Sequence, residues 1–317
     1  MTLHRNLCRR PLRTIHVDRT THFIKPTLIT RERLIAVAAG IVFGSLVLTY
    51  GLRILEAAMT FHPVRISGNI NLPKGAEDVW LNTSDGVRLH AWFFKSQRQS
   101  ADATVIYFHG NGGNITNVGW VAENLANRGF NTLLLDYRGY GQSQGEARSE
   151  SDLYADGDAA IAYVVDQRGV SLDQVVLYGQ SLGTTVAVDL AARHQCAALI
   201  LESGLSSASS IATRELPWLP RWLHFLGKNR FESAHKLKNV TAPVLITHGD
   251  PDPVISTDEA RTLFASANEP KKLLIYRGVG HNVFGSLGDR YLDVVEQFVR
   301  EALVEKHKVS GHPTERS

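Results

Sequence analysis

Residues 175–183, with the sequence VVLYGQSLG, decide the fold of this 317-residue chain. The first four residues are apolar and predict a buried β-strand, and the residues after Gly183 have the composition of a helix. A serine between two glycines on a strand-to-helix turn is typical of a nucleophile elbow, which raises the serine hydroxyl beside the N-terminus of the helix. The pattern therefore predicts that Ser181 is a nucleophile. The competing interpretation is an ordinary serine in a glycine-flanked loop.

Short apolar runs separated by helical stretches continue on both sides of this segment. Such alternation is typical of a mainly parallel sheet covered by helices on both faces. The first two runs, near residues 78–94, are separated only by a short turn at Ser84–Gly86, which predicts an antiparallel hairpin at one edge. The expected strands are Val87–Phe94, Thr104–Phe108, Asn131–Leu135, Val175–Tyr178, Ala197–Leu201, Val244–Thr247 and Leu273–Tyr276, and the expected helices lie at about 117–128, 151–167, 182–194, 256–267 and 289–306.

The segment Leu34–Leu52 contains no charged side chain and is flanked by Arg31 and Arg33 on one side and by Arg53 on the other. A helix of this length spans roughly 28 Å at about 1.5 Å per residue, close to the ~30 Å of a bilayer's hydrocarbon core. A buried core helix would show a polar stripe, and a cleaved signal peptide would have a shorter apolar region. We therefore expect an uncleaved signal anchor that crosses the bilayer.

Charge is distributed unevenly along the chain. Residues 1–33 carry eight Lys and Arg against two Asp and Glu, so this head is +6 and the remaining 284 residues are −3. The positive-inside tendency predicts a cytoplasmic N-terminus and an extracytoplasmic body, which in a bacterium means the periplasm. A mildly acidic body is not expected to bind nucleic acid. The two cysteines exclude a disulfide scaffold and a cysteine-rich zinc module.

The expected organisation has five parts. They are a basic head (1–33), a transmembrane anchor (34–53), a connector (54–75), a globular domain (76–306) and a polar tail (307–317).

The connection between the strands that end at Leu201 and begin at Val244 has about 40 residues, which is too long for a structureless loop in a compact domain. We expect a small helical cap at about 203–240. An apolar cluster in the cap either packs on the sheet or forms an acyl-chain slot or bilayer contact. Its members are Leu216, Trp218, Leu219, Trp222, Leu223, Phe225 and Leu226.

A nucleophilic serine needs a base, and the base needs an acid that orients it. The acid is expected after a later strand and the base after the next one. Asp252 and His281 satisfy this order after Ser181. Asp250 and Glu202 also lie near strand ends and remain alternatives for the acid. The sequence therefore predicts a Ser-Asp-His triad.

Two backbone N–H groups are expected to hold the oxyanion. Leu182, directly after the nucleophile, supplies the first. The strand Thr104–Phe108 ends in the glycine-rich sequence HGNGG (109–113), and Asn111 is the candidate for the second. Neither this loop nor RGYG (138–141) completes a nucleotide-binding G-x-G-x-x-G, and the chain has no Gly-Lys-Ser/Thr of a P-loop. His109 and His248, which lead His-Gly turns at strand ends, are expected to be structural.

Five motifs together resemble the α/β-hydrolase-domain family. The resemblance covers about residues 60–305, including FHP at 61–63, and is closest to the membrane-anchored branch that includes protein depalmitoylases and lysophospholipid or monoacylglycerol lipases. It implies the α/β-hydrolase fold, and it implies that the acid is Asp252, the aspartate of His-Gly-x-x-Asp. The motifs are HGNGGN (109–114), DYRGYGQS (136–143), GQSLG (179–183), HGDPDPV (248–254) and GHN (280–282).

The sequence thus predicts a membrane-anchored serine hydrolase that cleaves carboxylic esters or thioesters of a lipid or an acylated molecule. Water would hydrolyse the acyl-enzyme, so neither a metal nor an organic cofactor is required. A serine aminopeptidase-like peptidase is the alternative within this chemistry. A non-catalytic module of the same fold and a scaffold whose basic head binds anionic lipid are alternatives outside it.

Overall fold

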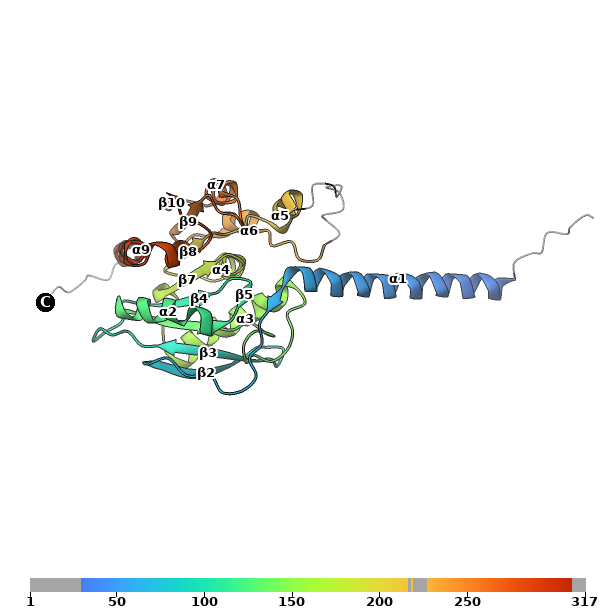
Figure 1. The fold of residues 1–317 in the computed structure, drawn as a ribbon, viewed down its shortest axis with the longest axis horizontal. Helices are drawn as coiled ribbons and strands as arrows, with labels where there is room; N and C mark the ends of the chain where they lie inside the picture. Colours follow the sequence, from blue (N-terminus) through green and yellow to red (C-terminus); the bar gives the residue numbers. More distant parts are fainter. Residues whose placement is uncertain (1–29, 216–217, 219–226, 310–317) are drawn as a thin grey trace, which may run out of the picture. The chain divides into compact units, whose positions relative to one another are not determined.

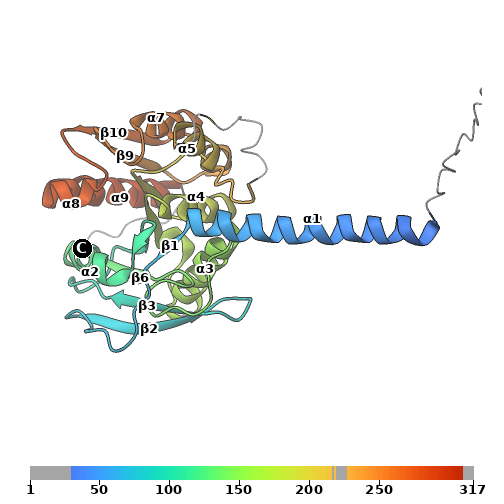
Figure 2. The ribbon, with the colours of Figure 1, turned by 45° about the vertical axis from the view of Figure 1, so that its right-hand side comes forward.

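A computed structural model of the protein describes residues 30–215, 218 and 227–309 (Figures 1 and 2). The chain divides into two units, Met1–Thr49 and Tyr50–Ser317. The second unit contains the sheet and every candidate site residue named above.

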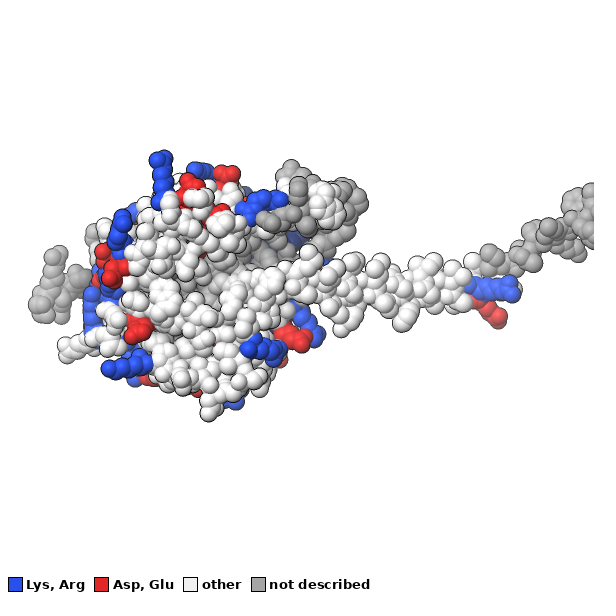
Figure 3. All heavy atoms as spheres, viewed as in Figure 1, with Lys and Arg blue, Asp and Glu red and all other residues white. Residues whose placement is uncertain are grey.

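Helix α1, Arg31–Thr60, is exposed at every residue from Arg31 to Leu55. It is long and apolar enough to cross a membrane, with a mean hydropathy of 2.1 over its most apolar window, and it is a candidate membrane span. Figure 3 shows α1 uncharged along most of its length, with charged side chains gathered at its N-terminal end.

Residues 54–60, which were predicted to begin the connector, belong to this helix. No glycine or proline interrupts the stretch from Arg53 to Thr60, and the Arg53 guanidinium pairs with Glu56 at 2.9 Å, three residues further along. The Thr60 hydroxyl donates to the Glu56 carbonyl oxygen at 2.7 Å. These local contacts carry the helix past the apolar segment, until Pro63 prevents its continuation.

The body is built on an eight-stranded sheet in the order β10-β9-β8-β7-β4-β6-β3-β2. Strands β2 and β3 form an antiparallel hairpin at one edge, as predicted, and β3 is also antiparallel to β6, whereas all other neighbours are parallel. The strands are β2 Ala76–Asn82, β3 Arg88–Phe94, β4 Ala103–Phe108, β6 Phe130–Leu135, β7 Val175–Gln180, β8 Ala198–Glu202, β9 Val244–Asp250 and β10 Lys271–Arg277.

Helices cover both faces of this sheet (Figures 1 and 2). Successive residues of a strand point to opposite faces, and in β4 the side chains of Ile106 and Phe108 join one buried apolar cluster whereas Val105 and Tyr107 join the other. The first cluster includes α3 (Glu150–Ala162), α4 (Gly183–Arg193) and α7 (Thr257–Ser266); the second includes α2 (Ile115–Asn127), α8 (Val283–Leu287) and α9 (Asp289–Val309). The doubly covered sheet predicted from the alternating pattern is confirmed.

The connection between β8 and β9 holds helix α5 (Ala208–Glu215), the short helix α6 (Ser233–Lys236) and a 3₁₀ turn at Leu237–Asn239. These elements agree with the predicted helical cap. The apolar cluster of the cap lies outside the described residues except for Trp218, which is exposed.

A second, two-stranded sheet joins the end of α1 to the body. Strand β1 (His62–Pro63) pairs in parallel with β5 (Gly112–Gly113), which lies in the glycine-rich loop after β4. The connector therefore contacts the loop that was predicted to hold the oxyanion.

Candidate active site

The turn after β7 places Ser181 in the left-handed region, at φ 52°. Glycines are required on both sides of it: a Cβ at Gly179 would lie 2.4 Å from the Gly183 carbonyl oxygen, and a Cβ at Gly183 would lie 2.0 Å from that of Phe108. The backbone N–H of Ser181 donates to the carbonyl oxygen of Glu202 at 2.9 Å, which fixes the turn. The turn therefore has the backbone of a nucleophile elbow.

An aspartate and a histidine from two later strands form a pair at the same edge of the sheet. The Nδ1 of His281 lies 2.8 Å from Oδ2 of Asp252. Oδ1 of Asp252 accepts from the backbone N–H groups of Val254 at 2.7 Å and Ile255 at 3.0 Å, so the carboxylate cannot rotate freely. With Nδ1 donating its proton to Asp252, Nε2 of His281 is the nitrogen left to accept another proton.

Burial alone would raise the pKa of the Asp252 carboxyl, whose side chain is 0% exposed. Hydrogen bonds from His248 and His281, together with the two backbone N–H groups, outweigh burial and hold the pKa of Asp252 below its ordinary value. Asp252 is therefore a carboxylate at neutral pH.

His248 lies beneath this pair and not at the surface. Its side chain is 0% exposed, and its Nε2 lies 2.9 Å from the carbonyl oxygen of Ile255 and 3.2 Å from Oδ2 of Asp252. His281 is 21% exposed. Of the two imidazoles next to Asp252, only that of His281 is open to a substrate.

Two consecutive residues at the end of β8 connect the nucleophile to the histidine. The carbonyl oxygen of Glu202 accepts from Ser181, and the hydroxyl of Ser203 donates to the carbonyl oxygen of His281 at 2.7 Å. On the other side, a Cβ added to Gly110 would lie 3.4 Å from Cβ of Ser181, so the glycine-rich loop packs against the elbow. The carboxyl ends of β4, β7, β9 and β10 thus gather the residues that the sequence predicted separately.

The two predicted oxyanion donors are backbone N–H groups, one in the glycine-rich loop and one directly after Ser181. The backbone N–H groups of Asn111 and Leu182 make no hydrogen bond to another residue in the described part of the chain. Leu182 immediately precedes α4, so its N–H belongs to the positive end of that helix dipole. Two donors of this kind suit a negatively charged oxygen bound above Ser181.

Glu202, an alternative for the acid, points elsewhere. Its Oε2 accepts from the Tyr178 hydroxyl at 2.5 Å, and its Oε1 accepts from the backbone N–H of Phe284 at 2.9 Å. Burial raises the pKa of Glu202. The Glu202 side chain therefore binds the backbone at the start of α8, just after His281, rather than the imidazole of His281. Tyr178, whose hydroxyl follows the apolar residues Val175–Leu177, is the sequence signal that could have indicated this buried network.

A further buried carboxylate, that of Asp136, lies next to the glycine-rich loop. Oδ1 of Asp136 accepts from the backbone N–H of Ile115 at 2.8 Å and lies 3.6 Å from Nε2 of His109, and Oδ2 lies 3.9 Å from Nδ1 of His90. Burial would raise the pKa of Asp136, but the two histidines outweigh burial and lower it. His109, only 1% exposed, has the surroundings of the structural residue that the sequence predicted.

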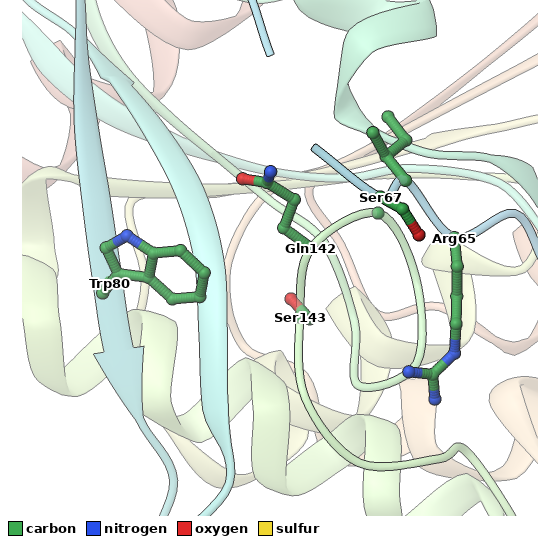
Figure 4. Close-up of a pocket in the computed structure, with 7 residues that line it drawn as sticks. Arg65, Ser67, Trp80, Gln142 and Ser143 are labelled. Carbon is green, nitrogen blue, oxygen red and sulfur yellow. The ribbon is translucent and has the colours of Figure 1, made fainter. Parts of the chain in front are cut away.

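A separate hollow of about 370 Å³ lies between the connector and the loop after Asp136. Figure 4 shows Trp80 and Arg65 on opposite sides of it, with Gln142 between them. None of the predicted catalytic residues lines this hollow, whose walls are Arg65, Ile66, Ser67, Trp80, Gly141, Gln142 and Ser143.

Comparison with known proteins shows to which family the chain belongs. The profile of the serine aminopeptidase S33 family matches residues 99–235. Alpha/beta hydrolase domain-containing protein 17B of Xenopus laevis is 37% identical over 223 residues, which cover 70% of this chain and 74% of that protein. The chain belongs to the α/β-hydrolase-domain family. This α/β-hydrolase is also 36% identical over 234 residues to an uncharacterized protein of Mycobacterium tuberculosis, covering 74% of this chain and 82% of the relative.

Solved structures show that the fold is that of α/β-hydrolases. An esterase of Pyrococcus furiosus matches with a TM-score of 0.64 and 20% identity, over 77% of this chain and 98% of the esterase. A monoacylglycerol lipase of Paleococcus ferrophilus matches with a TM-score of 0.52 and 18% identity, over 68% of this chain and 99% of the lipase. The protein is therefore an α/β-hydrolase by family and by fold.

Proposed function

We propose that this α/β-hydrolase is a membrane-anchored serine hydrolase that cleaves carboxylic ester or thioester bonds through Ser181, His281 and Asp252. The observation that carries the proposal is the 2.8 Å contact between His281 Nδ1 and the buried carboxylate of Asp252, at the sheet edge where the strained turn presents Ser181. A serine, a histidine with a free Nε2 and an ionised aspartate are the parts that acyl transfer needs.

The chemistry follows from these positions. Ser181 Oγ attacks the acyl carbonyl carbon while His281 Nε2 takes the serine proton, and Asp252 stabilises the imidazolium that forms. The carbonyl oxygen becomes an oxyanion and accepts hydrogen bonds from the backbone N–H groups of Asn111 and Leu182, each worth about 3–4 kcal/mol in such sites. His281 then returns the proton to the leaving alcohol or thiol. Water, deprotonated by the same imidazole, releases the acid and restores the serine.

The candidate membrane span favours an acyl substrate held in or near a bilayer. Lipid esters and acylated proteins both present a carbonyl beside a long apolar chain, and an anchored enzyme meets them at the surface to which it is bound. A peptidase of the serine aminopeptidase type is the second candidate, because the family profile carries that description. It would need an acidic group to bind a free amine, and the buried carboxylates of Glu202 and Asp252 are already engaged.

The two candidates are separated by substrate series with the full-length protein in detergent micelles. We expect p-nitrophenyl esters of increasing acyl length and acyl thioesters to be hydrolysed, and aminoacyl p-nitroanilides to remain intact, because the hydrogen bonds of Glu202 and Asp252 leave neither carboxyl group available to an α-amino group. Release of p-nitrophenol, thiol or p-nitroaniline is followed by absorbance. A preference for anilides with a free amino group would support the peptidase instead.

The charge bias supports a topology with the head in the cytoplasm and the body outside, which in a bacterium is the periplasm. With eight Lys and Arg before Leu34 and only Arg53 shortly after Leu52, a fusion of alkaline phosphatase after Ser317 is expected to be active in a bacterial host, and a β-galactosidase fusion inactive. The enzyme activities of the two fusions in whole cells provide the measurement. The reverse pattern would place the active site in the cytoplasm and make cytosolic acyl thioesters the better substrates.

A further inference from the structure

We propose that the residues joining helix α1 to the body are a working part of the oxyanion site: Thr60 and His62 clamp the side chain of Asn111 and thereby position its backbone N–H. In this proposal His62 is a positioning residue, and so is the side chain of Asn111. It rests on the proposed function, because it concerns the rate at which an oxyanion forms above Ser181.

The carboxamide of Asn111 is fully used by this clamp. Its Nδ2 donates to the Thr60 carbonyl oxygen at 2.7 Å and to Nδ1 of His62 at 2.9 Å. Its Oδ1 accepts from the backbone N–H of His62 at 3.0 Å and from the Tyr140 hydroxyl at 2.8 Å. An amide offers two donor hydrogens and two acceptor lone pairs, so all four are engaged and the reversed orientation would oppose like groups. The side chain therefore has one orientation.

The clamp continues along the backbone on the C-terminal side of Asn111. His62 and Pro63 pair in parallel with Gly112 and Gly113, directly after Asn111. Next to this pairing, Nδ2 of Asn114 donates to the carbonyl oxygen of Val64 at 3.1 Å. The connector thus follows the glycine-rich loop residue by residue, where glycines alone would leave the loop many conformations.

Attachment of the connector to the body does not depend on Asn111. Phe61 is 4% exposed and meets Phe231 edge to face at 6.3 Å between ring centroids, and Glu56 accepts from the backbone N–H of Asn229 at 2.8 Å. The four side-chain hydrogen bonds instead fix Asn111, the one residue of the glycine-rich loop to which we assign an oxyanion N–H. Because a misplacement of about 1 Å in a catalytic group can cost on the order of a hundredfold in rate, fixing this residue has a direct catalytic value.

The test compares Asn111→Ala with Asn268→Ala in the full-length protein in detergent micelles. Asn268 is a matched control, since its Nδ2 also joins two segments, through the carbonyl oxygens of Lys238 at 2.8 Å and Val240 at 2.9 Å. Both variants keep every backbone N–H. We expect Asn111→Ala to lower kcat for a p-nitrophenyl ester by about tenfold to a hundredfold with KM little changed, and Asn268→Ala to keep the wild-type kcat.

His62 supplies a second, graded test. His62→Ala removes the acceptor at Nδ1 and is expected to lower kcat several-fold, whereas His62→Asn can place an amide oxygen near the position of Nδ1 and is expected to recover most of the loss. Thermal unfolding of each variant shows that the measured protein is folded. A role confined to stability would move the unfolding temperature and leave kcat of the folded protein unchanged.

The outcomes separate this inference from the function on which it rests. An active wild type whose folded Asn111→Ala variant has the wild-type kcat, or loses activity only through KM, would overturn the positioning role alone. A wild type that hydrolyses no ester or thioester would overturn the proposed function, and the positioning role with it.

Discussion

The Ser181→Ala variant is expected to lose fluorophosphonate labelling completely and to lose kcat for ester hydrolysis by about a millionfold, since removing the nucleophile of such a triad nearly equals removing the whole triad. The fold should persist, because the substitution removes one oxygen and leaves the bond from its backbone N–H to Glu202 in place. Gel fluorescence after labelling and a steady-state ester assay measure both effects. Labelling that persisted in the variant would remove Ser181 from the mechanism.

The chain offers a matched control one strand away. Ser203 also lies in the left-handed region, at φ 49°, at the end of the neighbouring strand β8. It is 0% exposed and its hydroxyl is committed to the carbonyl oxygen of His281. Ser203→Ala is therefore expected to keep its label at Ser181. Loss of labelling in a folded Ser203→Ala protein, together with retained labelling of Ser181→Ala, would move the nucleophile to Ser203.

Asp252→Asn is expected to lower kcat by about ten-thousandfold, because an amide nitrogen facing Nδ1 of His281 would favour the tautomer that carries its proton on Nε2. In that tautomer Nε2 cannot take the proton of Ser181. The amide oxygen can still accept from the backbone N–H groups of Val254 and Ile255, so the local turn should survive. The ester assay, with circular dichroism to verify folding, measures the loss.

Two further variants address the other acids. Asp250 is exposed, and Asp250→Asn should leave kcat within a few-fold of the wild type. Glu202→Gln should weaken the hold on α8 without changing the tautomer of His281, so its loss should be far smaller than that of Asp252→Asn. A dead but folded Asp250→Asn beside an active Asp252→Asn would move the acid to Asp250, and a loss confined to Glu202→Gln would move it to β8.

The parts of the fold that the sequence predicted well depend on local signals. The apolar run before Gly179 and the glycines around Ser181 act within a few residues, and a parallel sheet brings the ends of its strands to one edge. For this reason the order of the strands predicts that Ser181, Asp252 and His281 share one edge, where the structure pairs Asp252 with His281. Spacing alone could not choose between Asp250 and Asp252, since the two lie two residues apart after the same strand. In the structure the Asp252 carboxylate lies 2.8 Å from His281, whereas Asp250 is exposed.

What the sequence could not reveal depends on contacts between distant residues. The bonds from Asn111 to His62 and Thr60 join positions 49 and 51 residues apart, and no periodicity in the sequence indicates such contacts. The end of the apolar segment suggested that the helix stops near Leu52, yet a short-range ion pair carries it to Thr60. Glu202 likewise accepts hydrogen bonds from the Tyr178 hydroxyl and from the backbone N–H of Phe284, which lies 82 residues after the glutamate.

The pairing of β1 with β5 also determines where the proposed membrane anchor can be cut from the body without loss of the clamp on Asn111. A protease cut that removed residues up to Arg53 would leave Glu56, Thr60 and His62 on the released body, and with them every hydrogen bond between this connector and Asn111. A cut after Pro63 would leave the sheet and the three proposed catalytic side chains intact, but would take away the strand beside the glycine-rich loop. Cleavage before Glu56 would thus keep the clamp on Asn111 and cleavage after Pro63 would remove it, so a shift of about ten residues in the cleavage site would decide whether the released body keeps the proposed oxyanion support.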